Sequence, residues 1–275
     1  MKFSRSFIFF FAFIEGLAVM SVEFLGAKIL APFFGTSLQV WTSVIGITML
    51  ALALGYYIGG KYSMRKNGAA LLTRIIFAGS LFLFLMPISS TPIILLVSKT
   101  DIYIGSVLAS ILLLLPSIIC FGMINPILIE NAGNGMKESG NSTGTVYAAS
   151  TIGAIFAVLL LGFFIIPYIG ISIPLYLLAS AMGIIVILIS GKNSKDKVVL
   201  KPLLMGVFLL LSGITAAFTL TQEKTIYKQH KVLYESEGLL GQIAVIDHYH
   251  GDFNRMLYVN GISQTNQSID RRAHV

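Results

Sequence analysis

The stretch SFIFFFAFIEGLAVMSVEFLGAKIL, residues 6–30, is long and apolar enough to place this chain among membrane proteins. A helix that crosses about 30 Å of hydrocarbon needs about 20 mostly apolar residues. The stretch follows Lys2 and Arg5, as a signal sequence would, but it runs on too long and no small-residue cleavage site follows it. We therefore expect a retained transmembrane helix.

Six further runs of the same character follow along the chain. They cover residues 39–60, 73–98, 103–129, 146–168, 172–190 and 203–220. The sequence therefore predicts an all-α polytopic membrane bundle of about seven transmembrane helices. Pro87 and Pro92 interrupt 73–98, and two separate pieces of that run would each be too short to cross. One kinked helix, or a helix plus a re-entrant piece, is expected there.

The composition agrees with a membrane protein. Hydrophobic residues make up 56% of the chain and the mean hydropathy is +0.85, outside the range of soluble globular domains. The net charge of +7 comes from residues 1–220, which hold 13 Lys and Arg against 6 Asp and Glu, whereas residues 221–275 hold 6 of each. The basic residues lie in short loops and form no basic face, which argues against a nucleic-acid partner.

The loop charges predict the orientation of the bundle. If the N-terminus is inside, the outer loops carry Lys99 alone, and the other basic loop residues are all inside. These inner residues are Lys2, Arg5, Lys61, Arg65, Lys66, Arg74, Lys137, Lys192, Lys195, Lys197 and Lys201. The positive-inside rule therefore predicts a multi-pass protein of the cell membrane with a cytoplasmic N-terminus. Seven full spans would then put residues 221–275 outside the cytoplasm.

Residues 221–275 form a second, polar unit after the membrane domain of residues 1–220. The runs 227–236, 241–249 and 255–259 contain alternating or β-branched residues, and His250-Gly251-Asp252 and Asn260-Gly261 provide turn residues. A short antiparallel β-ribbon is expected. Three such strands bury little apolar surface alone, so the unit looks like the start of a larger β domain.

Three charged residues in the first helix are candidates for intramembrane chemistry. Glu15 and Glu23 lie eight residues apart, about 80° around a helix, so they share one broad face. Lys28 lies nearer the edge of the hydrocarbon. Such carboxyls face a bundle interior because a charge facing lipid is costly. They predict either a site for protons or cations, such as a polyamine, or a pair of hydrogen-bonded carboxyls that lock the first helix to its neighbours.

Other residues suggest packing more than chemistry. Gly55 and Gly59, and the small residues of 149–157, allow close helix approach. Asn125-Pro126 is expected to break the fourth helix, as a simple kink or as a discontinuous helix of a transporter. His248 and His250 lack a third ligand and Cys120 lacks a partner, so we expect no metal site and no disulfide.

Three stretches of the membrane domain resemble the membrane-integrated branch of the spermidine synthase family, the polyamine aminopropyltransferases. They are EFLGAKILAPFFGTSLQVWTS (23–43), GYYIGG (55–60) and GTVYAASTIG (144–153). In the tail, VLYES (232–236), GQIAVID (241–247) and LYVNGISQT (257–265) resemble the β domain that opens these synthases.

The resemblance implies that a Rossmann-like, methyltransferase-type domain would follow the β domain in a complete enzyme. That domain transfers an aminopropyl group from decarboxylated S-adenosylmethionine, the co-substrate, to putrescine. The chain has no counterpart of it, so we expect no catalytic residue and no cofactor here, and Gln264 alone matches a substrate-binding position. Two functions stay open: the membrane subunit of an aminopropyltransferase with a separate or missing catalytic domain, or a transporter-like protein that handles a cationic solute through Glu15 and Glu23.

Overall fold

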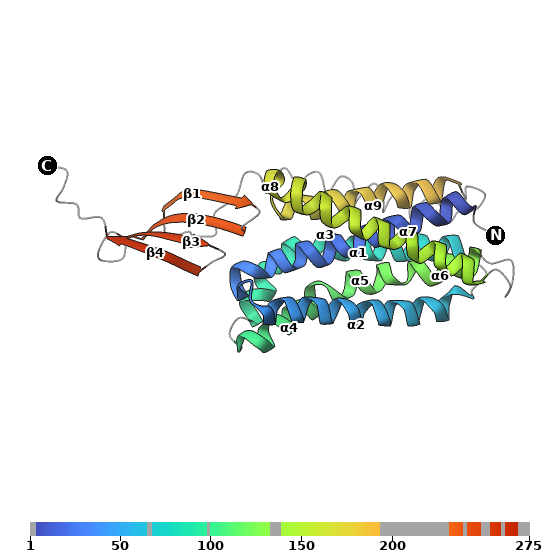
Figure 1. Cartoon of the computed structure of the whole chain (residues 1–275), viewed down its shortest axis with the longest axis horizontal. Coiled ribbons are helices and arrows are strands. Elements are labelled where there is room, and N and C mark those ends of the chain that lie inside the picture. Colours follow the sequence, from blue (N-terminus) through green and yellow to red (C-terminus); the bar gives the residue numbers. More distant parts are fainter. Residues whose placement is uncertain are drawn as a thin grey trace.

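The computed structural model describes residues 4–64, 68–97, 100–132, 139–192, 231–238, 241–248, 254–259 and 262–268, and the structural statements below concern these residues. A long helical bundle and a small β-sheet lie end to end (Figure 1). The domain boundary expected near residue 220, and the run 203–220 expected to be the last transmembrane helix, lie outside the described residues.

The bundle is built from long helices and several short helical pieces. In chain order these are α1 (Arg5–Phe34), α2 (Leu38–Ser63), α3 (Gly68–Val97), α4 (Ile102–Leu113), α5 (Leu115–Gly122), α6 (Ile124–Ala132), α7 (Ser139–Leu160), the π-helical turn η2 (Leu161–Ile165), α8 (Ile166–Ile169) and α9 (Ser172–Lys192). The Ser4 hydroxyl caps the start of α1 by accepting a hydrogen bond from the Phe7 N–H.

Five described segments are long and apolar enough to cross a membrane. They are Arg5–Phe34, Leu38–Ser63, Gly68–Val97, Leu115–Ala132 and Gly140–Ile169. The segments Ile102–Leu113 and Ser172–Val186 are apolar but shorter. The prediction of an apolar helical bundle is therefore confirmed. Of the six spans expected within the described residues, five are long enough to cross, and the sixth, Ser172–Val186, is shorter.

Proline explains why the expected helix over 103–129 is divided. Pro116 lies at the start of α5 and Pro126 at the start of α6. A proline offers no N–H to the carbonyl four residues earlier, and its ring pushes that carbonyl away. The break expected at Asn125-Pro126 accordingly lies at Met123, and a second, unexpected break lies at Leu114.

Two other prolines are accommodated without a break. α3 runs as one helix through Pro87 and Pro92, so the first of the two alternatives for this region is correct. Within this helix the Ser90 hydroxyl donates to the Pro87 carbonyl at 2.8 Å, so this buried serine is satisfied by its own helix. The π-helical turn η2 precedes Pro167 and absorbs the interruption of the hydrogen-bond ladder.

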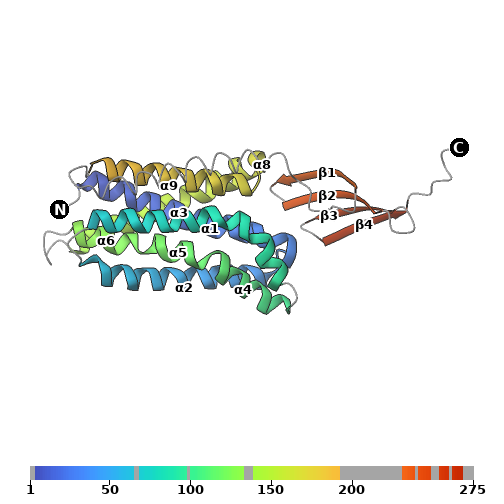
Figure 2. The ribbon, with the colours of Figure 1, turned by 180° about the vertical axis from the view of Figure 1, so that it is seen from behind.

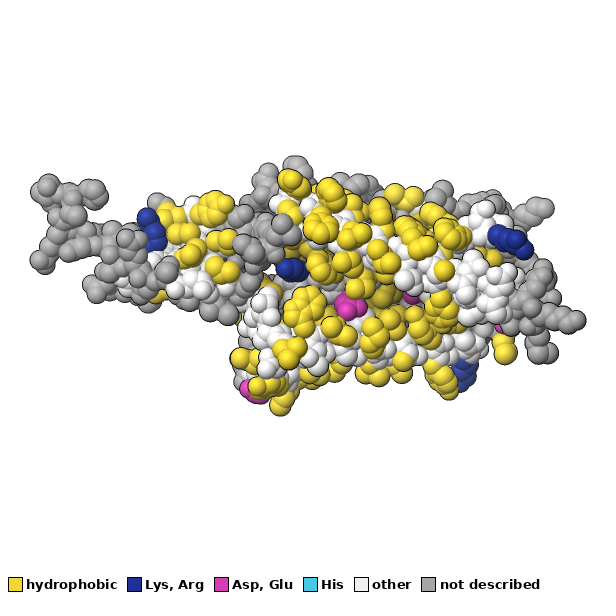
Figure 3. Space-filling model, viewed as in Figure 1, with side chains coloured by type: hydrophobic (Ala, Val, Ile, Leu, Met, Phe, Trp, Pro, Cys, Tyr) yellow, Lys and Arg dark blue, Asp and Glu magenta, His cyan; other side chains and the backbone are white. Residues whose placement is uncertain are grey.

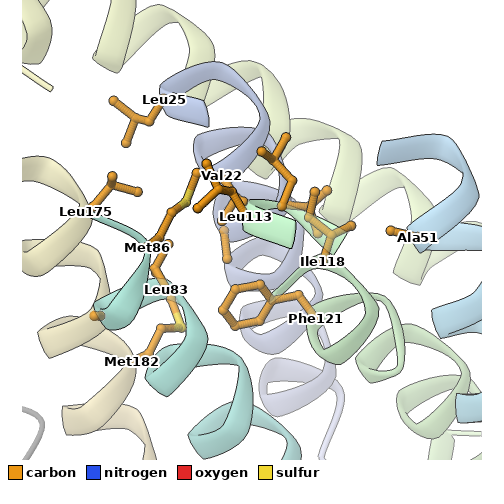
Figure 4. Close-up of a cluster of buried hydrophobic side chains, with 14 of the residues drawn as sticks. Val22, Leu25, Ala51, Leu83, Met86, Leu113, Ile118, Phe121, Leu175 and Met182 are labelled. Carbon is orange, nitrogen blue, oxygen red and sulfur yellow. The ribbon is translucent and has the colours of Figure 1, made fainter. Parts of the chain in front are cut away.

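The first helix is the most buried of the five long apolar helices. Its side chains Val22 and Leu25 point into a cluster with Leu83 and Met86 of α3 and Phe121 of α5 (Figure 4). Seen from behind, α9 lies along the edge of the bundle away from α2, and α3 lies between the two and packs against α9 (Figure 2). The helix α1 is thus the axis around which the others pack.

Large apolar side chains cover the outside of the bundle (Figure 3). Phe163, Phe164 and Leu96 are each more exposed than buried, and many Leu, Ile and Phe side chains of α2, α3 and α7 are exposed as well. Contiguous apolar surfaces of this size are rare on soluble monomers. The surface is the one that contact with lipid requires, and it fits a membrane protein.

Glycines permit the closest helix contacts, as expected for packing. A methyl group at Gly16 would overlap the Ser150 carbonyl oxygen, and one at Gly153 would overlap that of Phe13. The helices α1 and α7 therefore touch backbone to backbone. Gly55 and Gly59 of α2 approach α5 and Met123 in the same way. Small residues make such approaches feasible in membrane bundles.

The tail is a four-stranded antiparallel sheet rather than a three-stranded one. Its strands are β1 (Lys231–Gly238), β2 (Gly241–His248), β3 (Asn254–Val259) and β4 (Ile262–Ser268), and they pair in chain order. The sequence ISQTNQS of β4 is too polar to show a strand pattern, which is why this strand was not expected. Asp247 of β2 and its cross-strand neighbour Arg255 of β3 form an ion pair at 2.8 Å.

The sheet lies at the end of the bundle opposite the beginning of α1 (Figure 1). Strand β1 contacts α8, and β2 contacts α1. The side chains of Ala244 and Ile246 in β2 are buried. The described strands therefore rest on the helical part and do not stand alone.

We predict that Gly153→Ala destabilises the protein and that Gly144→Ala does not. Both positions lie in α7, so the gain in helix propensity is the same. A methyl group meets the Phe13 backbone at position 153 and open space at position 144. Overpacking costs about 1–3 kcal/mol. Melting temperatures in detergent would measure both, and equal values for the two variants would contradict the close α1–α7 contact.

Candidate functional site

The Glu15 carboxylate is the centre of a polar cluster inside the bundle. Its side chain is 1% exposed. Its Oε2 atom accepts hydrogen bonds from Nδ2 of Asn125 at 2.9 Å and from Oγ of Ser150 at 2.6 Å. These bonds join α1 to α6 and α7. The expectation that Glu15 faces the bundle interior, with its carboxyl hydrogen-bonded there, agrees with this geometry.

The two hydrogen bonds leave part of the cluster without partners. Both are accepted by Oε2 of Glu15, and no described residue donates to Oε1. The Asn125 side chain is completely buried, and its Oδ1 atom has no hydrogen-bond partner of ordinary geometry among the described residues. An orphaned buried acceptor of this kind costs about 1–3 kcal/mol. The cluster therefore has unused capacity for a donor.

Two tyrosines border the cluster. Tyr56 of α2 lies close to Glu15 and Asn125. Its ring meets that of Tyr147 of α7 edge to face, with centroids 6.2 Å apart. Apart from this ring contact, α2 and α7 hardly touch. The two rings thus bridge two helices that are otherwise separate.

Glu23 is also buried, at 7% exposure, and no described residue donates a hydrogen bond or forms an ion pair with it. Gly16 faces Ser150 of α7 and Gly26 faces Leu114 at the α4–α5 junction. Glu23 is about 20° from Gly16 and about 60° from Gly26 around the helix. It therefore lies on the side of α1 between α7 and the α4–α5 junction, which is also the side of Glu15.

These residues outline a groove along the side of the bundle. We call it the α2–α7 groove: Glu15 and Glu23 of α1 lie beneath it, and the contacting rings of Tyr56 and Tyr147 join its two sides. Figure 3 shows acidic atoms in the middle of the apolar flank, between α7 above and α2 below. The polar cluster thus lies beneath an apolar flank of the bundle.

The other predicted site residues do not join this cluster. Lys28 is half-buried, farther along α1. Gln264 is exposed in β4, where the register shift beside Leu257 makes it the extra residue of a β-bulge rather than part of a turn. Within the described part of the chain, no three His, Cys, Asp or Glu side chains come together as a metal site. The His250 residue and the His248 side chain lie outside the description.

Asn125, Ser150, Tyr56 and Tyr147 are the site residues that sequence reasoning missed. Asn125 was considered only as part of a helix break, and Ser150 lies in a run explained by packing. The two tyrosines lie in the stretches 55–60 and 144–153. In each case a polar or amphipathic side chain lies within an apolar run, and this feature could have indicated a residue of an intramembrane site.

No protein-family model, curated protein or solved structure matches this chain. The resemblance to the spermidine synthase family therefore stays a prediction.

We predict that Glu15→Gln lowers the melting temperature less than Glu15→Leu. Glutamine keeps an oxygen for Asn125 and Ser150, whereas leucine removes the acceptor of both, at about 1–3 kcal/mol for each donor left unsatisfied. Glu130, exposed on α6, provides the control, because Glu130→Gln and Glu130→Leu should be nearly neutral. Thermal unfolding in detergent would measure all four, and a Glu15→Leu variant as stable as the parent would contradict the structural role of the cluster.

Proposed function

We propose that the helical bundle is embedded in the membrane and binds an organic ammonium ion at Glu15. The observation that carries this proposal is the free Oε1 atom of a buried carboxylate whose other oxygen accepts two hydrogen bonds. A charge in the centre of a membrane helix costs about 2.5–3.5 kcal/mol on insertion scales. An ammonium group supplies both the missing donor and the compensating charge.

The surroundings of Glu15 favour an organic cation over a metal ion. Tyr56 places an aromatic ring beside the carboxylate, and the Tyr147 ring packs against that of Tyr56. A cation over such a ring gains about 0.5–2 kcal/mol. A metal site needs several anionic or imidazole ligands. Among the described residues no such group surrounds Glu15. An ammonium ion with alkyl substituents fits the mixture of carboxylate, amide and aromatic ring.

A second candidate is the membrane subunit of an aminopropyltransferase. Two of the stretches that carry the resemblance, 55–60 and 144–153, supply Tyr56, Tyr147 and Ser150 to the cluster. The antiparallel sheet follows the bundle, as the opening β domain does in that family. Decarboxylated S-adenosylmethionine would bind to a methyltransferase-type domain supplied by a partner or by further sequence. Putrescine and its products are ammonium ions, so the two candidates are compatible.

We also propose that the bundle has its N-terminal end in the cytoplasm and its sheet on the other side of the membrane. The distribution of basic loop residues supports the first part. The position of the sheet, at the end of the bundle opposite the start of α1, supports the second (Figure 1).

We expect the purified protein to bind hexylammonium with a dissociation constant at least about tenfold lower than that of Glu15→Gln, because the neutral amide loses the ion pair. Tyr56→Leu should weaken binding by a smaller factor, and Glu130→Gln should leave it unchanged. Isothermal titration calorimetry in detergent would measure the affinities. Equal affinity of the parent and Glu15→Gln, or no binding by the parent, would contradict the proposal.

The sidedness can be measured with single cysteines in a Cys120→Ser background. Met64 is 82% exposed at the end of α2, and Gln264 is exposed in the sheet. We expect an impermeant maleimide to label Gln264→Cys on intact cells, and Met64→Cys only after the cells are opened. Labelling of both, or of Met64→Cys alone, would contradict the proposed orientation. A cytoplasmic sheet would favour the aminopropyltransferase candidate, because the family's nucleoside co-substrate is cytosolic.

A further inference from the structure

We infer that the α2–α7 groove binds a linear α,ω-diammonium ion, held at one end by Glu15 and at the other by Glu23. This inference rests on the proposed function and deepens it, because it assigns the ligand a second charge and a length. Three observations carry it: the spacing of the two carboxylates, the lack of partners for Glu23, and the nature of the groove walls.

The spacing of the carboxylates sets the length of the ligand. Glu15 and Glu23 are eight residues apart on one continuous helix, which separates them by about 12 Å along its axis. Three covalent bonds of an extended chain advance about 3.6 Å. Nine bonds between two nitrogens, as in a diamine with about eight carbons or a triamine of similar length, therefore advance about 11 Å. A ligand of this size can reach both carboxylates while it lies along α1.

Glu23 indicates that the site is built for a second cation. Its side chain is more than nine-tenths buried, and no described residue pairs with it. Carboxylates within a membrane bundle normally have a partner in the bundle interior. The Glu15 carboxylate likewise keeps its Oε1 atom without a donor among the described residues. Ammonium groups at the two ends of one ligand would satisfy both positions.

The walls of the groove suit a hydrocarbon chain between the two charges. On α2, Leu52 and Met49 share the face of Tyr56, because they lie four and seven residues before it. On α7, Ala154 lies seven residues after Tyr147 and therefore on nearly the same face. These side chains are apolar and exposed or partly exposed. The methylene groups of the ligand would pack between these side chains, out of contact with water. The ammonium groups at its ends would contact the carboxylates of Glu15 and Glu23.

The test is a series of α,ω-diamines from three to about twelve carbons, titrated against the full chain in detergent together with monoamines of equal carbon number. We expect the affinity for diamines to pass through a maximum near eight carbons, where the diamine binds at least about tenfold more tightly than the matching monoamine. This maximum is measured on the parent protein, so the test does not require any variant to fold.

Three variants assign the two ends. Glu23→Gln should abolish the maximum and lower the diamine affinity to that of the matching monoamine, whereas Glu15→Gln should lower the affinity for both kinds of amine. Glu130→Gln should change neither. Monoamine binding without a chain-length maximum, or a maximum that survives Glu23→Gln, would overturn the two-point site and leave the Glu15 site standing. Failure of every amine to bind would overturn the proposed function as well.

Discussion

The buried carboxylate of Glu15 is the constraint on which the arrangement of the bundle depends. A carboxyl group in the hydrocarbon region cannot be satisfied by water, so its partners must come from neighbouring helices. Asn125 and Ser150 provide these partners from α6 and α7. Asn125 can do so because α6 begins next to Pro126, at the end of a divided helix. The break predicted at Asn125-Pro126 thus lies next to one donor of the site.

Ser150 takes part both in the close helix contact and in the polar cluster. Its carbonyl oxygen lies against Gly16, and its hydroxyl donates to Glu15, the residue before Gly16. The hydrogen bond forms only because glycine lets the two backbones touch. Conversely, the hydrogen bond fixes the register of α7 on α1, which close packing of small residues alone leaves weakly defined. The small-residue contact and the polar cluster are therefore one structural unit, with Tyr56 and Tyr147 on its outer side.

The sequence predicts the apolar helices, the interior position of Glu15 and Glu23, and the antiparallel tail, because these follow from composition and periodicity. It misses the division at Leu114, since a proline can divide a helix, as Pro116 does, or be accommodated in a continuous one, as Pro87 and Pro92 are in α3. It misses β4 because ISQTNQS gains its strand conformation from pairing with β3. Asn125, Ser150, Tyr56 and Tyr147 come from three different helices, and only the packing brings them to Glu15.

The position of the sheet bears on an enzymatic function but not on the proposed amine-binding function. A synthase domain that uses a cytosolic nucleoside belongs in the cytoplasm, yet the sheet lies at the bundle end away from the cytoplasmic start of α1 that the loop charges favour. The proposed ammonium site does not share this difficulty, because Glu15 and Glu23 lie within the helical part and their chemistry is the same from either face. The proposed amine-binding role therefore depends on the helical part alone. An enzymatic role requires in addition that the sheet and its catalytic partner share the compartment of the co-substrate.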